Sequence, residues 1–349
     1  MIAFVLAFFF ALVLGFAAHR GSVCTVRAVA EAMHARTFAM FRSVAKSVLW
    51  IIAITLPVFW LVPATAASVA GWQLTVAAAA GGFAFGLGAG INGACAYSTM
   101  ARLAEGEAGM LVTIAGFTVG VFGFTELVGA GAIARPSPAP AYVLSLTIWG
   151  LVAAFLLLAY GAYEVARLWQ SRPAGKSLRE LVLARPYRLS TAALVMGVSG
   201  ALVFLFYGSA GYTSTFEVVV EGALGDRPWP SVARWLLLVA VILGMFLSAL
   251  ARGGLRFDWR PRWDWIRNLA GGSLMGLGAA LTPGGNDVLV LYGLPSLSPH
   301  ALPSYGALAI GVVVAILLMR VLFGIEMRAE IKNDVFVSDW GLGTRPQKS

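Results

Sequence analysis

Charged residues are scarce in this chain. Only 12% of its 349 residues are charged and 59% are apolar, and the mean hydropathy is +0.83. A soluble domain has about 25% charged residues, so this composition excludes one. The apolar stretches are about 17 to 25 residues long, enough for a helix to cross a bilayer. The alternating polar and apolar pattern of a spanning barrel is missing. The sequence therefore predicts an all-α polytopic membrane protein.

Cysteine and histidine are also scarce. The chain has two cysteines and three histidines. Two cysteines are too few for a disulfide framework, and they lack the spacing and the histidine partners of a zinc or iron–sulfur site. No nucleotide-binding P-loop, HExxH motif or nucleophile elbow is present. We therefore expect no metal, no cofactor and no enzymatic activity.

Positive charge is concentrated in a few loops. The formal net charge of +9 requires no nucleic acid partner, because Lys and Arg collect in the cytoplasmic loops of membrane proteins. Basic residues follow the first apolar stretch and fill the segments 167–188 and 252–267, whereas 63–73 carries no charge. This pattern predicts a protein of the inner (plasma) membrane with its N-terminus outside and its C-terminus in the cytoplasm. About nine spans are expected, near 2–18, 44–62, 76–106, 109–130, 141–166, 190–208, 233–250, 268–290 and 303–322.

The chain contains an internal repeat. The segment GGFAFGLGAG, which starts at Gly81, recurs as GGSLMGLGAA, which starts at Gly271. We call the shift from Gly81 to Gly271 the repeat offset. The same offset aligns HRGSVCTVRAVAE with SAGYTSTFEVVVE. One unpaired span separates the copies, so they enter the membrane from opposite sides. Inverted repeats with broken helices are typical of transporters, and a non-conducting scaffold is the alternative. The predicted units are a first membrane repeat over 1–130, a linker span and connector over 131–189, a second, inverted repeat over 190–325 and a cytoplasmic tail over 326–349.

Each copy contains two glycine-rich breaks, which we call elbows. The predicted span 76–106 would be about 46 Å long as one straight helix, so we expect it to break near Asn92. Short helices that start at elbows direct unpaired N–H groups and partial positive charge toward the centre, which favours a small anion. Glycines that only allow close helix packing are the alternative. The elbow residues predicted to contact the substrate are Gly21, Thr25, Gly93, Ser214, Thr215, Gly284, Gly285, Asn286 and Asp287.

Both cysteines fall at elbows of the first copy. The repeat offset aligns Cys24 with Ser214 and Cys95 with Gly285. A thiol is a weak, polarizable hydrogen-bonding group, and near a helix N-terminus its thiolate is a nucleophile toward sulfur. The positions therefore suit a cargo that contains sulfur, although buried cysteine is often inert.

Three segments resemble the YeeE/YedE family of sulfur-transport membrane proteins: HRGSVCTVRAVAEA, FGLGAGINGACAYSTMARLAEGE and LTPGGNDVLVLYGLP. The resemblance covers most of the chain. It implies an hourglass of helices that takes up thiosulfate or a related ion by passing it between cysteines, here Cys24 and Cys95. It also implies that a TusA-like sulfur carrier could receive the cargo at the cytoplasmic face.

The chain departs from that family pattern in its second half. The better-known thiosulfate carriers have a further cysteine where this chain has only PGGND. Ser214, Thr215 and Asn286, together with elbow amides, could replace that outer relay. A selenium or sulfide species is an alternative cargo. A non-conducting membrane partner that presents a cysteine to a sulfurtransferase is an alternative function.

Asp287 is unusual because a carboxylate beside an anion path repels the cargo. Three interpretations are open: it caps a helix start, it pairs with an arginine such as Arg234 or Arg320, or it is protonated and couples transport to protons.

Overall fold

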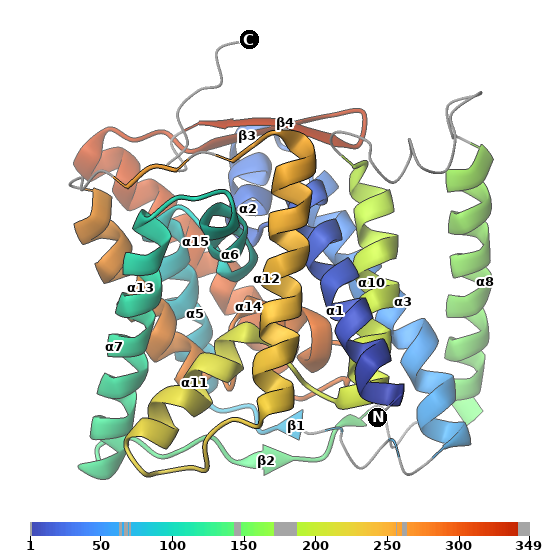
Figure 1. Ribbon diagram of the computed structural model, residues 1–349, viewed down its shortest axis with the longest axis horizontal. Helices are drawn as coiled ribbons and strands as arrows, with labels where there is room; N and C mark the ends of the chain where they lie inside the picture. Colours follow the sequence, from blue (N-terminus) through green and yellow to red (C-terminus); the bar gives the residue numbers. More distant parts are fainter. Residues whose placement is uncertain are drawn as a thin grey trace.

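The structure is a computed structural model and describes residues 2–340, apart from 63–64, 66–68, 70, 143–147, 171–186, 256 and 260–263. The predicted basic connector over 171–186 and the end of the predicted tail, 341–349, lie outside the described residues. Within them, eight helical segments are long and apolar enough to cross a membrane, and a ninth is formed by two helices bent by 48°. The predicted all-α polytopic fold with about nine spans is therefore confirmed (Figure 1).

The spans are built from long helices and shorter half-helices. In chain order they are α1 (Ile2–Gly21), α2 (Thr25–His34), α3 (Ala39–Leu61), α5 (Val76–Asn92), α6 (Ala96–Ala104), α7 (Gly109–Gly129), α8 (Ile148–Gln170), α10 (Leu189–Tyr207), α11 (Tyr212–Ala223), α12 (Val232–Arg252), α13 (Asp264–Leu281), α14 (Asn286–Val288), the π-helix η2 (Leu289–Gly293) and α15 (Ala301–Phe323). The predicted span 141–166 corresponds to α8, which ends later than expected, at Gln170.

All four predicted elbows are present. They separate α1 from α2, α5 from α6, α10 from α11 and α13 from α14. The break after α5 illustrates the cause. Gly93 ends the helix with φ 72°, a left-handed conformation that glycine adopts without a steric penalty. The chain then leaves the helix axis and starts α6 in a new direction.

Helix packing follows the repeat offset. α5 packs on its counterpart α13. α7 packs on α13, and α15, the counterpart of α7, packs in the same way on α5. Similarly, α1 contacts α10 and α12, while α10 contacts α3. At the crossing of α5 and α13, a Cβ on Gly88 would lie 2.4 Å from the carbonyl oxygen of Gly271, and one on Gly278 would lie 2.5 Å from that of Gly81. These two contacts map onto each other under the repeat offset, so the repeats meet through bare backbone.

The two copies run in opposite directions (Figure 1). α1 starts at the face that holds the N-terminus, and α10 starts at the opposite face. We call the first the N-terminal face. It also holds a two-stranded ladder of β1 (Gly71–Trp72) and β2 (Pro138–Ala139). α8 stands at the edge of the bundle, packs mainly on α3, and has no counterpart under the repeat offset.

The opposite face, which we call the hairpin face, is covered by a β-hairpin that the sequence analysis did not predict. Strands β3 (Arg328–Lys332) and β4 (Val335–Trp340) are antiparallel, and β3 packs on α2. The turn is anchored to the start of α10, because the carbonyl of Asp334 accepts from Leu189 N at 2.6 Å and its carboxylate from Ser190 N at 3.1 Å. The described part of the predicted tail is therefore a folded cover. The other predicted unit boundaries stay predictions.

Candidate functional site

The four elbows converge in the interior of the bundle. Cys24, Cys95, Gly211 and Gly285 are the N-cap residues of α2, α6, α11 and α14. The side chain of Asn286 bridges two elbows: its oxygen accepts from Ala96 N at 3.1 Å, and its amide nitrogen donates to Thr25 Oγ1 at 3.4 Å. Ala96 and Asn286 are counterparts under the repeat offset, so their bond lies where the repeats meet.

The two cysteines lie together at this centre. Both are free thiols with at most 1% of their surface exposed, and their side chains are close enough to interact electrostatically. The Cys24 thiol faces the backbone of Arg27 and Cys95, and the Cys95 thiol faces that of Ser98 and Thr25. Neither thiol makes a regular capping bond. Helix N-termini thus surround the sulfur atoms, which stabilises negative charge there.

A very small cavity adjoins Cys24. Its volume is about 10 Å³, enough for about one water molecule. The wall includes Cys24, Thr25, Ser47, Tyr97 and Asn286. The centre is therefore closed to an ion in this conformation, and side chains form the closure.

Asp287 supports the elbow before α11. Its carboxylate accepts from Thr213 N at 3.2 Å and from Thr213 Oγ1 at 2.6 Å, and the same hydroxyl accepts from Gly285 N at 2.9 Å. Asp287 thus caps a helix start, but that of α11 and not its own. Among the described residues, neither of the two arginines considered as partners forms an ion pair with Asp287. Arg234 donates to hydroxyl groups, and Arg320 pairs with Glu326.

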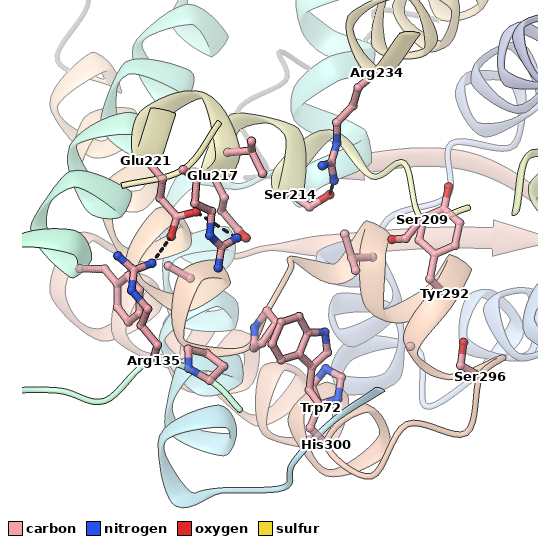
Figure 2. A pocket seen from close by; sticks show the side chains of 18 of the residues that line it. Trp72, Arg135, Ser209, Ser214, Glu217, Glu221, Arg234, Tyr292, Ser296 and His300 are labelled. Carbon is pink, nitrogen blue, oxygen red and sulfur yellow. Dashed lines mark hydrogen bonds and ion pairs between the residues drawn. The ribbon is translucent and has the colours of Figure 1, made fainter. Parts of the chain in front are cut away.

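A larger cavity, the vestibule, lies between the elbows of the second repeat and the N-terminal face (Figure 2). Its volume is about 270 Å³. Ser214, Pro283 and Val288 line its deep end, and Trp72 and Pro136 line it from the β1 and β2 segments. The further lining residues are Phe124, Arg135, Phe204, Ser209, Glu217, Val218, Glu221, Arg227, Arg234, Ala280, Tyr292, Gly293, Ser296 and His300.

Arg234 is the cation at the deep end of the vestibule. It donates to Ser214 Oγ at 3.0 Å and to Thr215 Oγ1 at 3.3 Å. Figure 2 shows its guanidinium group directed at Ser214. These partners are neutral, and no described ion pair involves Arg234. Its charge therefore remains available to an anion that enters the vestibule.

The other charges of the vestibule largely compensate one another. Glu221 pairs with Arg135 at 2.8 Å and with Arg227 at 3.1 Å, and Arg135 also contacts Asp226 at 3.0 Å. The buried Glu217 carries one oxygen without a hydrogen-bond partner among the described residues. Both glutamates of the vestibule, Glu217 and Glu221, lie on α11, about one and two helical turns beyond Ser214.

The predicted glycines shape the elbows. Gly93 and Gly284 have φ 72° and 117°. A Cβ on Gly21 would lie 2.4 Å from Ala192 Cβ, and one on Gly285 would lie 2.6 Å from Phe85 Cε2. The conformation or the packing of the elbows thus requires glycine at Gly21, Gly93, Gly284 and Gly285. The other predicted site residues contribute polar side chains to the same elbows; they are Thr25, Ser214, Thr215, Asn286 and Asp287.

Several site residues were missed by the sequence analysis. Thr213 stands within the predicted elbow, two residues beyond the N-cap Gly211, and a hydroxyl residue at such a helix start was a usable signal. Tyr305, whose hydroxyl is 3.4 Å from Thr25 Oγ1, sits in an apolar helix without any such signal. Arg135 and Arg227 lie in loops, and only the tertiary structure brings them to Glu221.

The hairpin covers the side of the centre opposite the vestibule. The Arg27 guanidinium lies over the Phe336 ring, 4.6 Å from its centroid, and Arg27 also donates to the carbonyl of Ser22 at 3.2 Å. Arg27 and Glu217 are counterparts under the repeat offset. The position that borders an open vestibule in the second repeat is therefore covered by Phe336 in the first.

A buried polar cluster fixes the end of α6 near the hairpin face. His19 bonds to Ser248 Oγ at 2.8 Å and to Glu105 Oε1 at 3.0 Å. Burial alone would raise the pKa of Glu105, but the His19 hydrogen bond and nearby positive charges outweigh it and lower that pKa. Among the described residues, no group of three His, Cys, Asp or Glu side chains could hold a metal ion.

Comparison with known proteins gives one result at the level of the family. A comparison with curated proteins finds no match. The family model described as "sulphur transport" matches residues 20–314, a range that includes all four elbows and both cysteines. Together with the multi-pass helical fold, this match means that the chain belongs to the YeeE/YedE family of sulphur-transport membrane proteins.

Proposed function

We propose that this protein takes up a small sulfur-containing anion, with thiosulfate as the first candidate, and that Cys24 and Cys95 relay it. The observation that carries this proposal is the meeting of the chain's two thiols at the point where the elbows converge. In a family of sulphur transporters, this is the place where a thiol would meet the cargo.

The proposed path enters from the vestibule. Ser214, Thr215 and Arg234 bind the oxygens of the ion and replace the outer cysteine of better-known carriers. Asn286 and the amides of the elbows then guide the ion past Gly284 and Gly285 to Cys95 and Cys24. It leaves near Gly21 and Gly93 toward the hairpin face. In this orientation the vestibule and the N-terminus face the outside of the inner membrane, and the C-terminus faces the cytoplasm.

The chemistry of the vestibule favours an oxyanion over sulfide. A guanidinium group beside two hydroxyls offers several donors to the oxygens of one ion. Hydrogen sulfide has no oxygen to accept them. Thiosulfate has both oxygens for the vestibule and a terminal sulfur for the thiols. We assign Asp287 the role of a structural cap, since its carboxylate is occupied by Thr213, and we assign no catalytic step to the protein.

Uptake of radiolabelled thiosulfate into sealed proteoliposomes tests the proposal. Native protein is compared with Cys24→Ala and Cys95→Ala under reducing conditions, with sulfate as competitor. Ser199→Ala is the matched control, because its buried hydroxyl bonds only within α10 and borders neither cavity described above. We expect both cysteine variants to lose most of the uptake, the control to keep it, and a sulfate excess to compete weakly.

Two outcomes would contradict the proposal. Well-reconstituted native protein that moves no thiosulfate would exclude this cargo and bring forward selenium species, sulfide or cysteine presentation to a sulfurtransferase. Full uptake in both cysteine variants would exclude the relay but keep the cargo. To test a TusA-like carrier as the receiver, the carrier is enclosed in the vesicles and the outer sulfur of thiosulfate is labelled. The carrier's thiolate would break the S–S bond of imported thiosulfate, keep the labelled sulfur as a persulfide and release sulfite, and vesicles with Cys24→Ala protein should form little of it.

A further inference from the structure

A second, strongly basic cavity lies at the hairpin face, away from the elbows. Its volume is about 410 Å³. Side chains from α3, the end of α8, the start of α10 and the turn of the hairpin enclose it. The lining residues are Ala39, Arg42, Ser43, Lys46, Arg167, Leu168, Arg188, Ser190, Asn333 and Asp334.

In the described part of the chain, this cavity is lined by more cations than carboxylates. Four cations line it, and two carboxylates contact it. Glu164, whose side chain is only 3% exposed, pairs with Lys46 and with Arg167. Asp334 accepts from Ser190 N. Among the described residues, positive groups thus outnumber negative ones here, and a partly buried cationic cavity of this kind attracts an anion.

The cavity lies at the hairpin-face ends of three spans, α3, α8 and α10. Arg42 and Lys46 stand in the first turns of α3, Arg167 stands in the last turn of α8, and Arg188 directly precedes α10. Below this level, toward the N-terminal face, α8 exposes the large apolar side chains of Phe155, Leu156, Leu158 and Tyr163. A molecule with phosphate in the cavity would therefore find an apolar helix surface directly beneath it.

We propose that this cavity binds the headgroup of an anionic phospholipid. The phosphates contact Arg42, Lys46, Arg167 and Arg188, the hydroxyls of the headgroup contact Ser190 and Asn333, and the acyl chains follow α8. Basic cavities between spans are a known form of lipid headgroup recognition. A diphosphatidylglycerol headgroup carries two phosphates, which the four cations of the lining can contact together.

A lipid fits this cavity better than a soluble anion does. α8 stands at the edge of the bundle with α3 as its main partner (Figure 1), and its exposed apolar side chains offer a surface to acyl chains that a soluble anion would not use. The layer of Ser43 and Ser47, which bond to the backbone of α10 at 2.8 and 3.3 Å, separates the cavity from the space near Cys24. The cavity is thus distinct from the proposed transport path.

Native mass spectrometry of the purified protein tests the proposal without any transport assay. The probes are diphosphatidylglycerol and phosphatidylethanolamine in detergent micelles, and inorganic phosphate. We compare native protein with Arg42→Gln, which breaks none of the ion pairs described above, and with the double variant Arg42→Gln/Arg167→Gln. The matched control is Arg320→Gln/Arg328→Gln, which removes two arginines of the same face outside the cavity.

We expect native protein to retain diphosphatidylglycerol, and each cation removed from the cavity to weaken its binding about fivefold. The control should bind as the native protein does. Equal binding in the cavity variants and the control would overturn the proposal. So would equal retention of phosphatidylethanolamine, or displacement of the lipid by millimolar inorganic phosphate, which would indicate a soluble-anion site.

Discussion

At the scale of the residue, the two repeats place different chemistry at equivalent positions. Cys24 of the first repeat corresponds to Ser214 of the second, and Thr25 corresponds to Thr215. The first position presents a thiol to the other thiol of the chain, whereas the second presents a hydroxyl to Arg234. Under the proposed function, sulfur recognition and oxygen recognition would be divided between the repeats, which suits an ion with both kinds of atom.

Arg234→Gln should weaken thiosulfate capture. The substitution removes the one vestibule cation that bonds only to neutral groups among the described residues, and a hydrogen bond to a charged group contributes about 1.5–3 kcal/mol. We expect the KM of uptake to rise roughly tenfold or more, with a smaller change for Arg234→Lys. Initial uptake rates at varied thiosulfate concentration give this value. An unchanged KM, equal to that of the control Arg320→Gln, would argue against a binding role.

Residue roles were predictable from the sequence where local backbone chemistry decides them. Gly93 and Gly284 marked breaks because glycine adopts positive φ without a steric penalty. The partner of Asp287 was not predictable, since Thr213 lies 74 residues away along the chain and only folding brings it near. The position of Arg234 on α12 likewise gives no sign of the hydroxyls that it contacts on α11.

At the scale of the element, the hairpin was missed although a local signal existed. The pair Asn333 and Asp334 adopts positive φ values of 51° and 65°, as a tight hairpin turn requires. β-branched and aromatic residues follow it, and Ile331 precedes it. The polar composition of the flanking residues hid this pattern. The broken helices, by contrast, were predictable because their glycines recur at a fixed offset.

Phe336→Ala should open the hairpin side of the centre. The substitution removes the ring that covers Arg27, three residues beyond Cys24. In a Cys95→Ala background Cys24 is the only thiol, so its labelling by a water-soluble maleimide reports access. We expect several-fold faster labelling than in the parent. Val337→Ala, an exposed neighbour on the same strand, is the control. Equal rates in all three proteins would show that the hairpin does not limit access.

His300 links the N-terminal ladder to the vestibule and should make it sensitive to acid. Ser298 accepts from Trp72 N at 2.9 Å and bonds to His300 Nδ1 at 2.8 Å. Burial lowers the pKa of His300 from 6.5 to about 4, so the folded state favours the neutral ring. The stabilisation is complete above the unfolded pKa and is lost as the pH falls from 6.5 toward 4.

The loss at pH 5 should be of order 2 kcal/mol. Thermal unfolding of detergent-solubilised protein at pH 7 and pH 5 measures it, and His300→Gln, which stays neutral, should show a smaller decrease in Tm between the two values. An identical decrease in both proteins would assign the acid sensitivity to other groups.

At the scale of the whole molecule, the repeats are joined by the crossing of α5 and α13. Their glycines bring backbone against backbone, so the nearest atoms cannot move away by a change of side-chain rotamer. Gly88→Ala and Gly278→Ala would each place a Cβ 2.4 Å from a backbone atom of the other helix. Overpacking of this kind costs about 1–3 kcal/mol, and the two variants, as counterparts, should lose similar stability.

Thermal unfolding in detergent checks this symmetry, with Gly306→Ala as control because a Cβ there meets nothing within 4 Å. The control should keep or slightly raise the Tm. A loss in only one of the two crossing variants would show that the halves do not share the contact equally.

α8 has a consequence for how the chain must be inserted into the membrane. Every other long helix has a counterpart, and α8 buries little of its surface against the bundle. What α8 contributes is one additional membrane crossing between the two repeats. Without this single crossing, α10 to α15 would enter the membrane in the opposite orientation. Ser214 and Arg234 would then face the side of the hairpin face and not that of the N-terminal face. A helix that adds little to the core is thereby as indispensable to the assembled molecule as the glycine crossing at its centre.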